Sequence, residues 1–130
     1  MCGSGETVVV TAALDKAFAA FAMTLAYPTD AVNLPGSGQS LGNRVVFDVS
    51  GGLNTASDDD DIGGDGVDDT LHASFVSNVE NPPGSVFTVT FDCIPGQSRP
   101  AAGAFTCTVV SASTPDAETI PDEVCTVSVQ

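Results

Sequence analysis

Apolar and polar residues alternate with a period of two along much of this chain. The segment 86–93, VFTVTFDC, shows the pattern most clearly, because every second position from Phe87 to Cys93 is apolar and the positions between them carry Thr or Asp. Successive side chains of a β-strand point to opposite faces. The segment therefore predicts a strand with one buried face and one face in water.

The segment 18–27, FAAFAMTLAY, permits either a helix or a strand, because it contains several alanines. Its larger residues nevertheless occupy every second position from Phe21 to Tyr27. A strand would gather these larger side chains on one core face. We therefore predict a strand here, ended by Pro28.

Five further segments are strand-like, and turns rich in Gly, Pro and Asn separate them. They are 6–14, 44–50, 70–79, 105–113 and 125–130, and a short apolar piece lies at 31–34. No segment has a convincing helical pattern. Seven or eight short strands without a helix predict an all-β fold, an antiparallel β-sandwich that residues 1–130 form as a single domain.

Composition narrows the classes of partner. The hydrophobic fraction of 42% is enough for one core, and the formal net charge is −14, because 17 acidic residues face only Lys16, Arg44 and Arg99. Without a basic patch, nucleic acid and anionic membranes are excluded as expected partners. No apolar run reaches the length of a membrane span, so we expect no membrane insertion. Divalent cations, basic surfaces and neutral carbohydrate remain open.

The acidic stretch 57–69, SDDDDIGGDGVDD, holds seven of the 17 acidic residues. Its glycines allow the backbone to fold back sharply, and carboxylates crowded in this way repel one another unless a counterion is present. Ca²⁺ accepts several carboxylate and carbonyl oxygens in flexible geometry, so calcium is the expected cofactor. The alternative is a solvated acidic loop that keeps the surface soluble. The candidate ligands are Asp58, Asp59, Asp60, Asp61, Asp65, Asp68 and Asp69.

Within this stretch, residues 61–71, DIGGDGVDDTL, resemble the calcium loop of dockerins and other EF-hand relatives. The matching loop positions one, five, six and nine are Asp61, Asp65, Gly66 and Asp69. Two positions depart from the pattern, because Gly63 stands where a third ligand is expected and His72 stands where a bidentate acid is expected. No helical pattern flanks the loop, so we do not predict an EF-hand.

The four cysteines lack any spacing that suits zinc, and they indicate a secreted or surface protein with disulfides. Sequence alone allows three pairings. Cys93 and Cys107 are both expected to face inward near strand ends, so we favour a bridge between them. Cys2 and Cys125 would then pair within the chain or between subunits, and a lipid attached to Cys2 is a further alternative.

With these strands in order, the chain resembles the cohesin-like family of extracellular scaffolding and adhesion modules, which are sandwiches of jelly-roll or Ig-like architecture akin to carbohydrate-binding modules. The matching pieces are GETVVVTAAL, FAAFAMTLAYPTDAV, PGSVFTVTFDC, FTCTVVSASTPDAETIP and CTVSV. The resemblance implies a binding partner that is another extracellular protein, such as a dockerin.

Two features depart from that family. Its members begin with a further strand that pairs with the last one, whereas only Met1 to Ser4 precede Gly5 here. The first strand is therefore expected to be missing, through trimming or because a strand of a neighbouring subunit fills its place. The cysteines are the second departure, and they indicate a protein selected for durability.

No catalytic constellation is evident. His72 is the only histidine, no nucleophile can be assigned a base, and the aspartates have no apolar pocket that would raise a pKa. The chain has no Trp, and its single tyrosine, Tyr27, is expected in the core, which disfavours carbohydrate binding by stacking. We expect a non-catalytic extracellular assembly module, calcium-bound and self-associating, with a dockerin receptor or a carbohydrate-binding module as alternatives.

Overall fold

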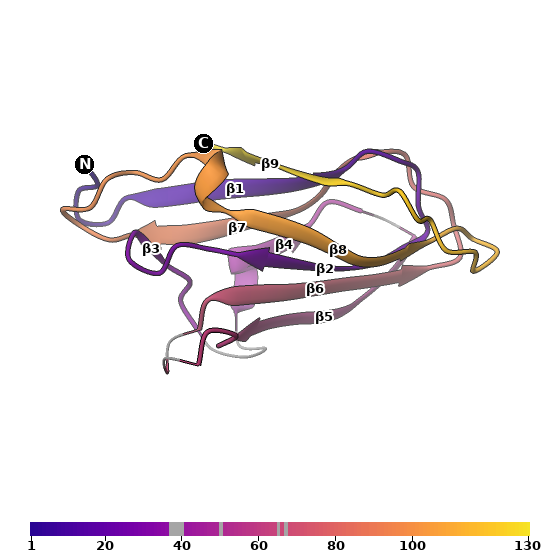
Figure 1. Ribbon diagram of the computed structural model, residues 1–130, viewed down its shortest axis with the longest axis horizontal. Coiled ribbons are helices and arrows are strands. Elements are labelled where there is room, and N and C mark those ends of the chain that lie inside the picture. Colours follow the sequence, from indigo (N-terminus) through magenta and orange to yellow (C-terminus); the bar gives the residue numbers. More distant parts are fainter. Residues whose placement is uncertain (37–40, 50, 65, 67) are drawn as a thin grey trace.

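A computed structural model describes residues 1–36, 41–49, 51–64, 66 and 68–130, and for residues 54–60 it describes only the backbone pairing. The described chain forms two antiparallel sheets that lie in two layers (Figure 1). The strands are β1 Thr7–Leu14, β2 Ala20–Ala26, β3 Val32–Asn33, β4 Val45–Phe47, β5 Gly52–Asp60, β6 Thr70–Ser77, β7 Gly84–Cys93, β8 Thr106–Ser113 and β9 Cys125–Val129, with single 3₁₀ turns η1 Gly42–Arg44 and η2 Ala102–Ala104. The predicted all-β sandwich is confirmed.

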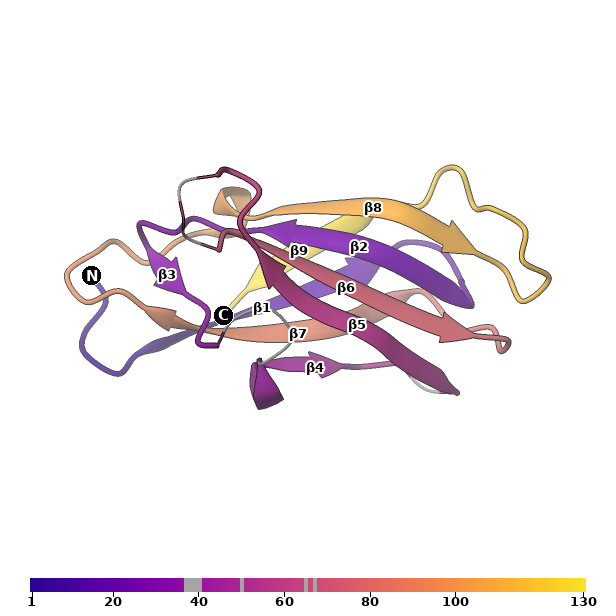
Figure 2. The same ribbon diagram turned by 90° about the horizontal axis from the view of Figure 1, so that it is seen from below.

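The first sheet, called the β1 sheet, has the order β3-β7-β1-β9, and β4 also pairs with β7. The second, called the β2 sheet, has the order β5-β6-β2-β8, and Figure 2 shows its four strands side by side. Strands β1 and β2 follow each other in sequence but lie in different sheets. In these strand orders β9 is an edge strand of the β1 sheet, and β8 and β5 are the two edge strands of the β2 sheet.

The core lies between the two sheets and follows the predicted alternation. Phe87, Val89 and Phe91 are fully buried on β7, while Thr88 and Thr90 between them are partly exposed. Phe91 packs against the ring of Tyr27, with ring centroids 4.9 Å apart. On β2 the predicted larger residues are buried, and they are Phe21, Met23 and Leu25, with Tyr27 just beyond the strand. The choice of a strand over a helix for this segment is confirmed.

Most predicted strands differ from the observed ones by one or two residues at an end, and two differences are larger. Strand β4 is shorter than the segment 44–50, because Arg44 belongs to the preceding 3₁₀ turn. Residues 57–60, expected in a loop, belong to strand β5, where Asp58 pairs with His72 and Asp60 pairs with Thr70 across the ladder to β6. Aspartate has low β propensity, but an available partner strand overrides it, and charges are well tolerated on an edge strand.

The favoured pairing of the cysteines is also wrong. The disulfides join Cys2 to Cys93 and Cys107 to Cys125, with Cα–Cα distances of 5.9 and 5.8 Å. Cys93 lies on β7, inside the β1 sheet, whereas Cys107 lies on β8, at the edge of the β2 sheet. Alternation placed both side chains inward but could not tell which strands meet. The neighbour of β8 across the sandwich is β9, which carries Cys125.

Candidate functional site

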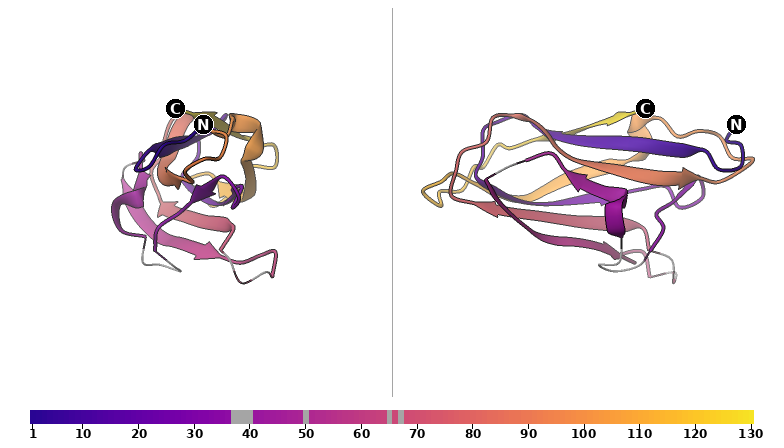
Figure 3. Two further views of the ribbon diagram at one scale, coloured as in Figure 1. Left: turned by 90° about the vertical axis from the view of Figure 1, so that its left-hand side faces the viewer. Right: turned by 180° about the vertical axis from the view of Figure 1, so that it is seen from behind.

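The segment 61–69, called the acidic loop, follows β5, and its described residues 61–64, 66, 68 and 69 lie on the side of the molecule away from both marked chain ends (Figure 3). The carboxylate of Asp69 closes the base of this loop. Its Oδ1 accepts hydrogen bonds from the backbone N–H of Ile62 at 3.0 Å and from the hydroxyl of Thr70 at 2.8 Å, and its Oδ2 accepts from the N–H of Gly63 at 2.9 Å. These bonds, first from Gly63 and then from Thr70 and Ile62, lower the pKa of Asp69 below its ordinary value.

Asp61 closes the turn of the same loop. Its Oδ1 accepts from the N–H of Gly64 and its Oδ2 from the N–H of Gly66, both at 2.7 Å. Both glycines have positive φ, at 74° and 85°, which is the left-handed conformation that glycine adopts most readily. A side chain at Gly63 would place a Cβ 2.8 Å from Oδ2 of Asp69. The glycines are therefore needed so that these two carboxylates can reach the backbone N–H groups.

The acidic loop is attached to the core through Tyr27. The backbone N–H of Tyr27 donates to the carbonyl of Asp69, and its hydroxyl donates to the carbonyl of Asp68, both at 3.0 Å. An open pocket of about 470 Å³ lies between the loop and the end of β2, and its lining includes Asp30, Ile62 and Asp69. The tyrosine that we expected in the core thus also fixes the position of the acidic loop.

The structure describes the side chains of only three of the seven candidate metal ligands. Asp61, Asp68 and Asp69 are described, whereas Asp65 and the side chains of Asp58, Asp59 and Asp60 lie outside the described part. Within the described residues, no group of three or more His, Cys, Asp or Glu side chains is gathered to hold a metal ion. Asp61 and Asp69, at calcium-loop positions one and nine, each bind backbone N–H groups with both oxygens. Calcium binding stays a prediction.

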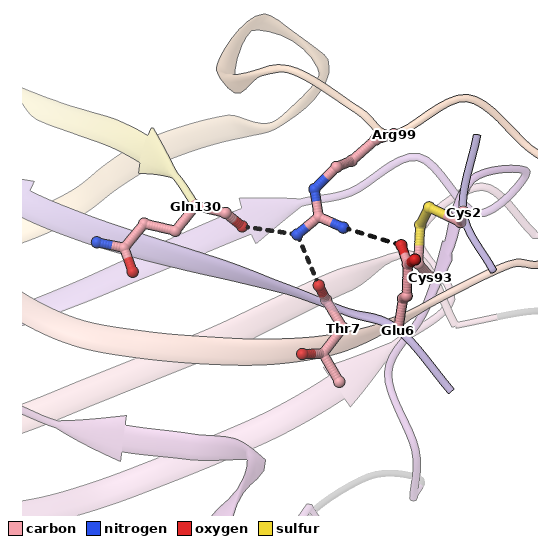
Figure 4. The surroundings of a disulfide bond; sticks show 6 residues. All are labelled: Cys2, Glu6, Thr7, Cys93, Arg99 and Gln130. Carbon is pink, nitrogen blue, oxygen red and sulfur yellow. Dashed lines mark hydrogen bonds and ion pairs between the residues drawn. A yellow bond between two sulfur atoms is a disulfide. The ribbon is translucent and has the colours of Figure 1, made fainter. Parts of the chain in front are cut away.

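The N-terminal segment does not fill the place of the expected first strand. The N–H of Cys2 donates to the carbonyl of Gln97, and the N–H of Gly96 donates to the carbonyl of Cys2, both at 2.9 Å. Together with the Cys2–Cys93 disulfide, these bonds hold the segment beside the loop that follows β7 (Figure 4). Among the described residues, no strand pairs with the outer side of β9.

The hydrogen-bonding groups on that outer side follow from the register. Gln130 and Val9 exchange two hydrogen bonds, at 2.9 and 3.3 Å, so they form a hydrogen-bonded pair at the end of the β1–β9 ladder. Such pairs recur at every second residue of an antiparallel ladder. The N–H and C=O groups of the intervening residues Cys125, Val127 and Val129 therefore point away from β1. We call this row of groups the open edge of β9.

Arg99 fastens the far end of β9. Its Nη2 donates to the carbonyl of Thr7 at 2.8 Å and to the carbonyl of Gln130 at 3.1 Å, and its Nη1 lies 3.5 Å from the carboxylate of Glu6 (Figure 4). The pattern of residues along the chain does not predict this role. The available signal was that Arg99 is one of only three basic residues in the chain.

A second set of contacts fastens the start of β9. The Oδ1 of Asp15 accepts from the N–H of Val124 at 2.8 Å, and Oε1 of Glu123 accepts from the N–H of Lys16 at 3.1 Å. Glu123 is only 9% exposed, and its Oε2 has no hydrogen-bond partner among the described residues. Burial raises the pKa of Glu123 above its ordinary value, although the hydrogen bond from Lys16 acts in the opposite direction.

The outer face of the β2 sheet carries small, uncharged side chains over its central strands. Ala22 lies opposite Ser74 on β6 and Ser111 on β8. Leu53 and Val76 are paired across β5 and β6, and they are 73% and 54% exposed. A pocket of about 350 Å³ lies among these strands. The face is thus partly apolar and exposed to solvent.

Comparisons of the chain with protein-family models, with curated proteins and with solved structures find no match. The described residues contain no helix that is long and apolar enough to cross a membrane. The two disulfides are typical of a protein that folds in an oxidising environment.

Proposed function

We propose that the protein is a non-catalytic extracellular structural module whose copies associate when a strand of one copy pairs with the open edge of β9 in another. The observation that carries the proposal is that edge itself. Its backbone groups have no partner strand among the described residues, and the exposed side chains of β9, Thr126 and Ser128, carry no charge. An edge strand without charges or proline is a template for strand addition.

The contrast with β5, an edge strand of the β2 sheet, supports this choice. Strand β5 ends in three consecutive aspartates, Asp58 to Asp60, and charges on an edge strand oppose pairing with another chain. Two copies that each carry a net charge of −14 repel each other most strongly where their acidic residues meet. Contact through β9 keeps the β5 edges of the two copies apart.

Two further elements belong to the proposal. An extracellular location accords with the paired cysteines, because such bonds persist in oxidising compartments. Ca²⁺ is the counterion proposed for the acidic stretch, since it would reduce repulsion within one copy and between copies.

The test is sedimentation velocity and negative-stain microscopy of the oxidised protein over a range of concentrations, with Ca²⁺ and after chelation. Two variants that add the same charge separate the surfaces. Ser128→Asp places a carboxylate on β9, and Ser74→Asp places one on the outer face of the β2 sheet. We expect larger species for the wild type and for Ser74→Asp, and monomers for Ser128→Asp. A wild type that stays monomeric at every concentration would refute the proposal.

One observation favours a second function, a cohesin-type domain that binds a dockerin-like protein. The outer face of the β2 sheet is partly apolar, with Leu53 and Val76 exposed, as a protein-binding surface requires. Titration calorimetry with a dockerin-bearing protein tests it. Binding that Ser74→Asp abolishes and Ser128→Asp leaves unchanged would support the receptor function.

A further inference from the structure

The two disulfides differ in their access to solvent. Cys2 and Cys93 are 4% and 3% exposed and belong to the buried core. Cys107 and Cys125 are both half-buried and lie on the edge strands β8 and β9. Thiol–disulfide exchange requires a thiolate to reach a sulfur atom, so access separates an inert bridge from a reactive one.

The half-buried bridge also has a special place in the topology. Strands β8 and β9 belong to different sheets and share no ladder of hydrogen bonds. The Cys107–Cys125 bond is therefore a covalent link between the two layers at this side of the sandwich, where β8 and β9 lie close together. Besides this bond, β9 pairs with β1, is contacted by Asp15 and Arg99, and packs Val127 and Val129 against the core.

We propose that the Cys107–Cys125 disulfide is a site of thiol–disulfide exchange whose opening loosens β9 from the β2 sheet. A thiolate forms a new S–S bond with one of the two sulfurs, and the bond between Cys107 and Cys125 breaks. Its electron pair leaves on the other sulfur, which takes up a proton. A second thiol then attacks the mixed disulfide, so that the two external thiols become one disulfide and the protein gains two thiols. This inference goes beyond the proposed function and does not depend on it.

The surrounding charge indicates the class of thiol. Asp15 and Asp122 lie close to the start of β9, Lys16 is the one basic side chain among the described residues that contacts them, at 3.9 Å from the carboxylate of Asp15, and the whole chain carries a charge of −14. Because the attacking group is itself a thiolate, a thiol that also carries a net charge from carboxylates is repelled more strongly than one whose only charge is the thiolate. The reactive partner is therefore a small thiol or dithiol without carboxylates, and added salt should reduce its advantage over one that carries them.

The experiment exposes the folded, oxidised protein to 2-mercaptoethanol or to glutathione, each at low and at high salt. Iodoacetamide then traps free thiols, and mass spectrometry identifies the labelled cysteines. We expect Cys107 and Cys125 to be labelled about tenfold or more faster than Cys2 and Cys93. We expect 2-mercaptoethanol to react faster than glutathione at equal thiolate concentration, with a smaller difference at high salt. Equal labelling of all four cysteines, or earlier labelling of Cys2 and Cys93, would overturn the proposal.

Amide hydrogen exchange tests the loosening of β9. In the wild type with only Cys107 and Cys125 reduced and alkylated, amides of β9 should exchange on the order of a hundredfold faster, because the link to β8 is lost. The double variant Cys107→Ser with Cys125→Ser should reproduce this change without alkylation. Unchanged amide exchange in both samples would refute the proposal that opening this disulfide loosens β9. Assembly is measured separately by sedimentation without any thiol, so failure of the proposed function is distinguishable from failure here.

Discussion

The two free sides of this sandwich are held together in different ways. On the side of β8 and β9, a disulfide joins the edge strands, and Glu123 and Arg99 fasten the two ends of β9. On the side of β5, the acidic loop is closed by hydrogen bonds that Asp61 and Asp69 accept from its own backbone. The side of β8 and β9 is joined covalently, whereas the acidic side has no covalent tie among the described residues. The disulfide that links the two layers thus lies on the opposite side of the sandwich from the acidic stretch.

The largest expected effect is the loss of unfolding free energy when a disulfide is removed, and it differs between the two disulfides. In the chain-entropy model, loss of Cys2–Cys93, which spans 91 positions, costs about 4.5 kcal/mol of unfolding free energy, and loss of Cys107–Cys125, which spans 18, costs about 3 kcal/mol. Urea unfolding of the two double Cys→Ser variants measures both values. A larger loss for the Cys107–Cys125 variant would show that the edge bridge does more than close a short loop.

The next effect concerns Glu123 and pH. The pKa of Glu123 is raised in the folded state, so the protonated carboxyl favours folding. This contribution is fully present below about pH 4.5, and it is lost as the pH rises through the raised pKa and the buried carboxyl becomes charged. Glu123→Gln keeps an acceptor for the N–H of Lys16 and removes the buried charge. We expect it to raise the unfolding free energy at pH 7 by on the order of 1 kcal/mol and to remove that part of the pH dependence.

Glu123→Gln is measured by urea unfolding between pH 4 and pH 7, with Glu118→Gln as the control for loss of an exposed carboxylate. Equal gains from the two variants would assign the effect to net charge rather than to burial.

The acidic loop should respond to acid in the opposite direction. The pKa of Asp69 is lowered, so its stabilising contribution is present above its ordinary value of 3.8 and is lost as pH falls through the lower folded-state pKa. Asp69→Asn should therefore speed amide exchange at Ile62 and Gly63, because the paired acceptors are lost. Asp68→Asn removes the same charge from the neighbouring residue. Equal exchange in both variants would mean that charge, and not the hydrogen bonds, holds the loop.

The smallest expected effect is that of Ca²⁺ on the thermal midpoint and on amide exchange in the acidic loop and in β9. Millimolar Ca²⁺ should raise the thermal midpoint more than NaCl of equal ionic strength, and it should slow amide exchange in the acidic loop but not in β9. A midpoint that depends only on ionic strength would reduce the acidic stretch to a screened, solvated surface.

Much of this fold follows from local pattern. The period of two located the strands around Phe21 and Phe87 and assigned their buried faces, because a half-buried strand must alternate. Strand β5 was missed because its aspartates and glycine resemble a loop, and only the partner strand β6 makes it extended. The local residue pattern therefore identifies which face of a strand is buried better than it identifies which strands lie next to each other.

The candidate site was less predictable, because it depends on contacts between distant segments. The turning role of the acidic-stretch glycines was predicted from composition, and Gly64 and Gly66 have the required conformation. The pairing of Cys107 with Cys125 depends on which edge strands meet across the layers, which alternation cannot supply. The buried position of Glu123 depends on the turn after β1, 107 positions earlier in the chain.

All three basic side chains are engaged in contacts. Lys16 donates to the carbonyl of Asp122, Arg44 binds the carboxylate of Asp92 at 2.9 Å, and Arg99 holds two backbone carbonyls. Proteases that cleave after lysine or arginine must insert that side chain into their own pocket, and they act on exposed, flexible segments. Each such site here must first release its cation from the fold. A chain with so few cationic residues, all held in this way, should resist trypsin-like digestion for as long as it stays folded.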